Sequence, residues 1–203
     1  MTHSNSAQVD LKEIEGDGPG CYGVPGEGDE TMAENGPVTT QSLIADDATP
    51  VPWAEACGRL AKIGTYWLAT VRPNGRPHAV PVLAVWVDGA LHFVASETSR
   101  KARNLAGNSH CVITGGSDGL DLVVEGAVTK VRDGARLQAV ADAYASKYGW
   151  HVTVRDGAFH DAEGAPAPTA GPPPFDVYQV TPTTAFAFGT EDETINASTR
   201  WRF

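Results

Sequence analysis

The stretch TYWLATVRPNGRPHAVPVLAVWVDGALHFVASETSRKARNL, residues 65–105, decides the fold because strand patterns and turn signals alternate along it. Its apolar segments 65–71, 78–87 and 90–96 predict strands, and the pairs Asn74-Gly75 and Asp88-Gly89 between them predict two hairpins. Pro81 lies inside the second strand. Because proline has no N–H for a strand ladder, we expect a bulge or an unpaired position there. The basic residues that follow predict a short helix over 98–107.

The rest of the chain extends this pattern. Residues 49–64 predict a helix, 110–116 and 120–131 predict two more strands, and 135–149 predict an amphipathic helix. A loop is expected over 151–174, followed by the last strands in 175–189 and at the C-terminus. About six strands joined mostly by hairpins predict a mainly β (α+β) fold, a six-stranded antiparallel β-barrel with helices at its rim.

The charge is unevenly distributed along the 203 residues. Of the formal net charge of −10, residues 1–50 carry −9, from ten acidic residues against Lys12 alone. Residues 1–48 contain few large apolar side chains, so we expect a disordered acidic segment, with the folded domain over 49–203. The nearly neutral domain lacks the basic excess that binding to nucleic acid requires.

The cysteines and the apolar runs bear on the compartment. The sequence has an odd number of cysteines, Cys21, Cys57 and Cys111, and their spacing is not that of metal ligands. We therefore expect no disulfide framework and no metal site, which fits a cytoplasmic protein. The N-terminus has no signal-peptide pattern, and the longest apolar run, 79–87, is too short to span a membrane.

The segment SETSRKARNL, residues 96–105, predicts an anion site. A helix N-terminus has unpaired N–H groups and the positive end of the helix dipole, which attract phosphate. Arg100 and Lys101 in the first turn oppose that dipole, and a bound anion would resolve the conflict. The alternative is an exposed helix start whose basic side chains face water.

Motifs for other chemistry carry little weight in the sequence. It contains no GxxxxGK[ST] or HExxH. Its one GxGxxG match, GPGCYG at 18–23, lies in the acidic segment without a strand pattern before it, and its GxSxG match, GGSDG at 115–119, lies at the predicted turn between two strands. His78 and His92 lie on neighbouring predicted strands and are interpreted as a core or surface pair, and Glu125 as a structural carboxylate in its strand. With no nucleophile, general base or metal cluster, a bound cofactor would have to supply any reaction chemistry.

Three segments together resemble a known family: GTYWLATVRPNGRPHAVPV, then VDGALHFVASETSRKARNLAGN, then the terminal TRWRF. They are similar to the split β-barrel flavin and deazaflavin oxidoreductases, the superfamily of pyridoxamine 5′-phosphate oxidase. The resemblance covers about residues 52–203 and implies a homodimer with a cofactor at each of two sites between subunits. It does not cover the acidic N-terminal segment.

The resemblance also implies which residues bind the cofactor. The phosphate of the cofactor would be bound by Ser99, Arg100 and Lys101, and Asn104 would orient these residues. Backbone groups of one strand segment would face the ring: Val80, Pro81, Val82, Leu83 and Ala84. Arg200 and Trp201, with Arg202, would approach the site from the C-terminus, either in the same chain or in the partner subunit. Trp67 and Trp86 are expected in the core.

One departure from the family pattern bears on the cofactor. Pyridoxamine phosphate oxidases proper have basic residues at both ends of the ring-facing segment, whereas VPVLAV has none. The sequence therefore looks closer to the actinobacterial branch that uses coenzyme F420, a deazaflavin with a phosphate and a polyglutamate tail. That tail would lie along Arg100, Lys101 and Arg103, and Arg72 and Arg76 on the hairpin would extend this basic groove.

The function that follows is an F420-dependent oxidoreductase acting on an electron-poor small molecule such as an enone or a quinone. Tyr66, His78 and solvent are candidate proton donors, and the loop 151–174 is a candidate lid. The alternatives are an FMN-dependent enzyme on the same barrel and a non-catalytic protein that binds flavin, F420 or haem, with His78, His92 or His110 as the haem ligand.

Overall fold

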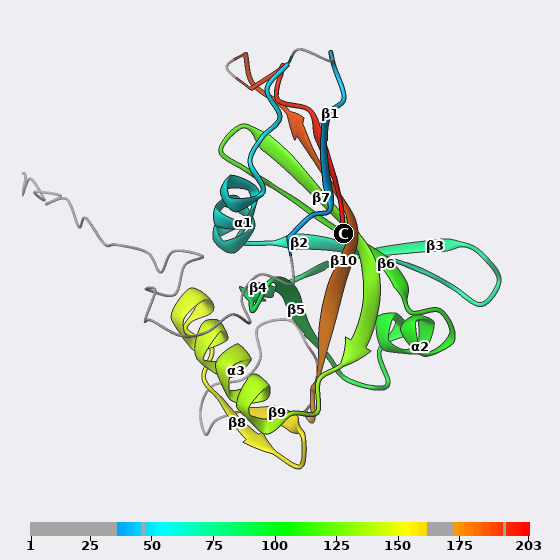
Figure 1. Ribbon diagram of the computed structural model, residues 1–203. Helices are drawn as coiled ribbons and strands as arrows, with labels where there is room; N and C mark the ends of the chain where they lie inside the picture. The colour runs from blue at the N-terminus through cyan, green and yellow to red at the C-terminus, as the bar shows by residue number, and fades with distance from the viewer. Residues whose placement is uncertain (1–35, 46–47, 162–172, 193) are drawn as a thin grey trace, which may run out of the picture.

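The computed structural model describes residues 36–45, 48–161, 173–192 and 194–203, which contain eleven strands and three helices (Figure 1). The helices are α1 (Trp53–Lys62), α2 (Arg100–Gly107) and α3 (Gly134–Tyr148). The strands are β1 (Thr39–Ser42), β2 (Tyr66–Val71), β3 (Pro77–Val82), β4 (Ala84–Val87), β5 (Ala90–Ala95), β6 (His110–Ser117), β7 (Leu120–Lys130), β8 (Val152–Arg155), β9 (Ala158–Asp161), β10 (Asp176–Gly189) and β11 (Thr199–Arg202).

Nine of these strands form one antiparallel sheet, where the sequence predicts six. Its order is β1-β11-β10-β7-β6-β2-β3, and β5 joins it by pairing with β10 and with β4. The count differs for two reasons. First, the predicted strand 78–87 divides at Leu83 into β3, which pairs with β2, and β4, which pairs with β5. Second, the short strands β1 and β11 extend the sheet. The mainly β, antiparallel prediction is confirmed.

The predicted hairpins are confirmed. Of the two possibilities predicted at Pro81, the structure has no bulge, and the missing hydrogen bond falls on the free edge of β3. Asp88 and Gly89 both have left-handed backbone, with φ of 49° and 74°, as the tight turn between β4 and β5 requires. Pro81 pairs in regular register with Trp67 of β2. Because β3 is the last strand on its side of the sheet, the missing N–H of Pro81 can face away from β2 without disturbing the ladder.

The two faces of the sheet differ sharply in burial. One row of directly opposed residues is almost completely buried and consists of Leu68, Ile113, Val124, Ala185 and Trp201. The adjacent row is open and consists of Pro81, Trp67, Thr114, Val123, Phe186, Arg200 and Gln41. Trp67 is 53% exposed, so its predicted place in the core is wrong. We call the face that carries this second row the open face.

A second hydrophobic cluster holds α3 against β4 and β5. It joins Val85, Val94, Leu137, Val140, Tyr144, Trp150 and Phe159. The side chain of Asp133 caps the start of α3 by accepting a hydrogen bond from the Arg136 N–H at 2.8 Å, and Gly149 ends the helix with a φ of 65°. The hairpin β8–β9 forms within the segment 151–174 that the sequence predicts to be a loop.

The N-terminal boundary also differs from the prediction. β1 lies before residue 49 and pairs with β11 from Thr39↔Arg202 to Ser42↔Thr199. Most of the predicted acidic segment, residues 1–35 and 46–47, lies outside the described residues. In the part of the chain that is described, no helix is long and apolar enough to cross a membrane.

Candidate functional site

The start of α2 is built as the sequence predicts. Ser99 is the N-cap residue, and its Oγ accepts a hydrogen bond from the Ala102 N–H at 3.3 Å. Arg100 and Lys101 follow in the first turn, which contains no acidic residue. Two cations therefore lie at the end of the helix that favours negative charge.

The β2–β3 hairpin brings further residues to this helix. The buried Asn104 of α2 donates from Nδ2 to Thr70 Oγ1 of β2 at 2.9 Å. Thr70 lies directly opposite His78 of β3, and its hydroxyl donates to the His78 carbonyl at 3.4 Å. Asn104, which the sequence assigns to orienting the site, therefore fastens α2 to the hairpin.

Charge accumulates between the hairpin and α2. Partial burial lowers the pKa of His78, and the positive charges of Arg72, Arg100 and Lys101 lower it further. Burial also lowers the pKa of Lys101. Among the described residues, no carboxylate lies within ion-pair distance of Arg72, Arg100 or Lys101. These groups form what we call the cation cluster: Arg72, His78, Arg100 and Lys101.

Unsatisfied polar atoms show that the cation cluster fits an anion. Arg72 Nε and His78 Nδ1 are buried and have no hydrogen-bond partner in the structure. Buried donors are normally paired, and a phosphate group would give them acceptors and offset the clustered positive charge. The sequence already offers Arg72, with Arg76, as an extension of the basic groove along α2, whereas it names His78 as a candidate proton donor and haem ligand and not as part of a phosphate site. The arginines on either side of the Asn74-Gly75 turn are the signal for the hairpin side of the cluster.

The predicted ring-facing segment, residues 80–84, runs along β3 away from the cation cluster. The side chains of Val82 and Ala84 are buried, Val80 and Leu83 are half-buried, and Pro81 is exposed. At its far end, α3 engages the backbone. Tyr144 donates from its hydroxyl to the Leu83 carbonyl at 2.8 Å, and Tyr148 to the Ala84 carbonyl at 2.8 Å. The Val80–Val82 part of the edge strand is thus the part that α3 leaves open.

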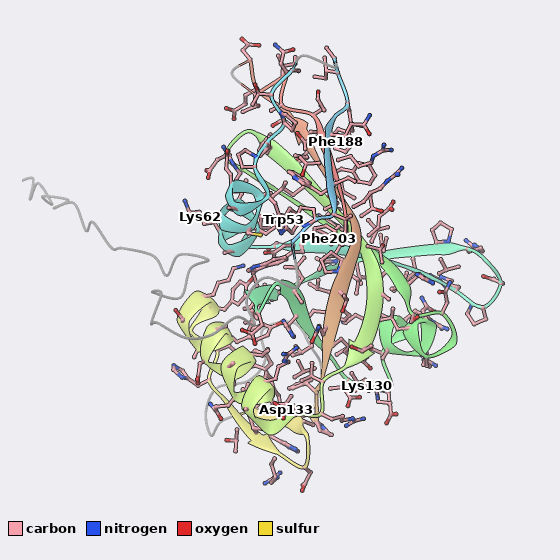
Figure 2. All side chains as sticks on the ribbon, in the orientation of Figure 1. Trp53, Lys62, Lys130, Asp133, Phe188 and Phe203 are labelled. Carbon is pink, nitrogen blue, oxygen red and sulfur yellow. The ribbon has the colours of Figure 1, made fainter. Side chains whose placement is uncertain are left out.

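The two predicted C-terminal site residues face opposite sides of β11. Arg200 lies on the open face and donates from its guanidinium to Gln41 Oε1. Trp201 is completely buried and packs on Trp53 at a ring distance of 5.2 Å, beside Phe203 (Figure 2). β11 is separated from β3 by four strands of the sheet, so neither residue joins the cation cluster within one chain.

Comparison with known proteins identifies the family. Residues 54–188 match the model of the family described as pyridoxamine 5′-phosphate oxidase. The chain belongs to the pyridoxamine 5′-phosphate oxidase family. No curated protein matches it.

Solved structures with the fold of this pyridoxamine 5′-phosphate oxidase family member are distant in sequence. A conserved hypothetical protein from Mycobacterium tuberculosis is 16% identical with a TM-score of 0.55, over 72% of this chain and 89% of that one. A haem-binding protein from Mycobacterium smegmatis is 18% identical with a TM-score of 0.52, over 70% and 59%. A NimC/NimA family protein from Clostridium acetobutylicum is 19% identical with a TM-score of 0.50, over 66% and 86%. These likenesses establish the fold.

A cavity of about 320 Å³ lies beside the hairpin of this family member. β2, β3, β6 and β7 line it with mostly apolar side chains such as Ala69 and Val112, together with His110 and Glu125. Thr70, which holds Asn104, also lines it, so the cavity adjoins the elements that carry the cation cluster. Within the described residues, no group of His, Cys, Asp and Glu side chains could hold a metal ion.

Proposed function

We propose that this protein is an oxidoreductase that binds the deazaflavin coenzyme F420 and passes hydride between it and an electron-poor small molecule such as an enone or a quinone. The observation that carries the proposal is the cation cluster, which has unpaired buried donors and no carboxylate partner in the described structure. It lies at a helix start next to an edge strand, in a family named for a flavin enzyme.

The residues around the proposed ring site support F420 over FMN. The segment 80–84 has no charged side chain, so it would hold the ring through backbone groups and apolar contacts. Arg103 and Arg76 are exposed on α2 and on the hairpin, next to the cation cluster in sequence. Their charges would be available to a polyglutamate tail that extends beyond the phosphate. FMN, which has the phosphate without the tail, is the alternative cofactor.

The cofactor would supply the hydride, and the protein would bind, orient and exclude water. Tyr66, one of the candidate proton donors, is fully buried and donates its hydroxyl to the Leu60 carbonyl. Burial raises its pKa far above the usual range, so it is a structural residue rather than an acid that faces a substrate. His78 belongs to the cation cluster, where its ring would contact the phosphate.

The open face supports assembly as a homodimer. Its exposed apolar side chains include Trp67, Val71 and Phe188, which are 53%, 39% and 41% exposed. An exposed apolar sheet face of this kind is typical of a subunit interface, and a second copy is its natural partner because a two-fold contact is self-complementary. Arg200 lies on the same face, so the dimer would carry it toward the partner's site.

The test is a tryptophan-fluorescence titration of the full-length protein with F420, FMN and haem in parallel. We expect quenching by F420 at micromolar concentrations or below. The double variant Arg100→Ala, Lys101→Ala should weaken that affinity at least tenfold, with little change in thermal stability without cofactor. Lys62→Ala, at an exposed lysine of α1, is the matched control.

Other outcomes would change the proposal. Preference for FMN would replace F420 by the alternative cofactor, and equal loss of affinity and stability in the double variant would make the cation cluster structural. A haem Soret band that is lost with His110→Ala would support the non-catalytic binding alternative. His92 is a poor candidate for that role because it is completely buried and burial lowers its pKa to about 4.

A further inference from the structure

Lys147 occupies an unusual position at the end of α3. Its Nζ donates to the Ala84 carbonyl at 3.0 Å, at the point where the predicted ring-facing segment ends. Nζ also lies 3.4 Å from Tyr66 Oη, and it sits over the rings of Tyr66 and Tyr148 at 5.0 and 5.2 Å. The helix thus brings a cation to a strand segment that has none of its own.

This cation has no counter-ion in the described structure. No carboxylate lies within ion-pair distance of Lys147, and the titratable groups that contact it are the tyrosines Tyr66 and Tyr148. Burial raises the pKa of both tyrosines, so they are neutral at physiological pH. Burial alone accounts for the pKa of Lys147, which it lowers to about 8.

The ammonium group has hydrogen-bonding capacity to spare. An ammonium has three N–H donors, and in the described structure Lys147 contacts two acceptors, the Ala84 carbonyl and Tyr66 Oη. The side chain is half-buried rather than enclosed, so the third N–H is available to solvent or to a ligand.

The position of Lys147 relative to the cation cluster defines the two ends of one site. His78 lies six residues before Ala84, a span of roughly 20 Å in an extended strand. A cofactor whose phosphate lies at the cation cluster and whose body follows the open edge of β3 would therefore extend toward Lys147.

We propose that Lys147 stabilises the reduced form of the bound cofactor by balancing the negative charge that a flavin or deazaflavin ring carries after reduction. Uptake of one hydride, that is two electrons and one proton, by a neutral ring leaves one negative charge on it. A nearby ammonium favours that state over the neutral oxidised ring, which raises the reduction potential. This role rests on the proposed function.

A structural role is the competing explanation. Lys147 lies in the last turn of α3, where a cation complements the helix dipole, and it helps to hold the strand break at Ala84. A structural lysine would affect stability and leave the two redox states of the cofactor equally well bound.

The experiment measures the midpoint potential of bound F420, and of bound FMN, with dithionite as the reductant and a reference dye. It compares wild type with Lys147→Met, Lys147→Arg and Lys62→Met. Lys62 is the matched control because it also lies in the last turn of its helix but is exposed (Figure 2). We expect Lys147→Met to bind oxidised cofactor normally and reduced cofactor about tenfold more weakly, which lowers the two-electron potential by about 30 mV. Lys147→Arg and Lys62→Met should stay near wild type.

Wild-type protein alone gives a second readout. As the pH rises through the pKa of Lys147, the ammonium loses its charge, and the potential of bound cofactor should fall relative to that of free cofactor. Identical potentials in wild type and Lys147→Met, or no such pH dependence in wild type, would overturn the role of Lys147 and leave the proposed function standing. Failure of wild type to bind either cofactor would overturn the proposed function and this role together.

Discussion

Asn104 of α2 and Thr70 of β2 are joined by a hydrogen bond of 2.9 Å between two side chains that are each 2% exposed. This contact ties α2 to the β2–β3 hairpin, alongside the packing of Ala102 and Leu105 in the core. The cation cluster draws two of its members from each element, so the bond helps to hold its geometry.

Replacing Asn104 by Ala should destabilise the fold by about 1–3 kcal/mol, because the buried Thr70 hydroxyl loses a donor and a small void forms. Urea unfolding followed by circular dichroism measures the effect. Asn196→Ala, at an exposed position, should change stability by less than about 0.5 kcal/mol. Equal stability of the two variants would show that the buried bond contributes nothing.

Anion binding at the cation cluster should tighten as the pH falls. The pKa of His78 is lowered by burial and by its cationic neighbours, and a bound anion favours the charged ring, so binding and protonation reinforce each other. Sulfate is a suitable probe because its own charge is constant between about pH 5 and pH 8, where histidine titrates. Calorimetric titration should show this pH dependence in wild type and in His151→Gln, an exposed control, and a flat profile in His78→Gln.

The same linkage has a consequence for stability without ligand. Because the pKa of folded His78 lies below its unfolded value of 6.5, protonation favours the unfolded chain. The contribution of neutral His78 is present above about pH 6.5 and is lost as the pH falls below that value and through the lower pKa of the folded protein. Acid unfolding of His78→Gln should therefore begin at lower pH than that of wild type, and an identical transition would contradict this.

A charge on the open face should separate the proposed dimer. Trp67→Arg places a cation at the most exposed aromatic side chain of the open face, where a second copy would have to bury it. Sedimentation velocity should show wild type as a dimer and the variant as a folded monomer. Ile195→Arg, at a site 57% exposed outside the strands, should remain dimeric. A monomeric wild type would refute the interface.

Adjacent residues of β11 should have separable effects. Trp201→Ala removes a completely buried side chain and should cost about 3–5 kcal/mol of unfolding free energy. Arg200→Ala should alter stability by less than about 0.5 kcal/mol but weaken cofactor binding if the dimer carries Arg200 to the partner's site. Urea unfolding measures the stability and fluorescence titration the affinity. Normal stability with weakened cofactor binding in Trp201→Ala would restore Trp201 as a site residue.

Much of the fold was predictable because its signals are local. Asn74-Gly75, Asp88-Gly89 and the amphipathic pattern over 135–149 depend only on neighbouring residues, and the structure contains all three features. The missed hairpin β8–β9 had such a signal too, since Asp156 and Gly157 both adopt left-handed backbone at its turn. The pairing of β1 with β11 had none, because it joins segments far apart in the chain.

The site was harder to predict than the fold. Alternation within TRWRF separates Arg200 from Trp201, but only the complete sheet register shows which face is covered. Likewise, nothing in the sequence distinguishes Lys147 and Tyr148 from other residues of their helix. Only the tertiary structure places them at the Leu83–Ala84 break. Most of the cation cluster was predictable, since Arg100 and Lys101 mark the helix start and Arg72 marks the hairpin, whereas the place of His78 in it depends on the tertiary structure.

The edge strand β3 carries prolines at Pro77 and Pro81, and this has a consequence for aggregation. An uncovered edge strand can template further strands from other molecules and so initiate fibres. Each proline removes an N–H from the edge, so a foreign strand cannot form a continuous ladder there. A small ligand needs only a few backbone groups, so the two missing N–H groups weaken its binding little. The same two residues would therefore let the proposed cofactor use the exposed edge of β3 while they prevent another polypeptide from pairing with it.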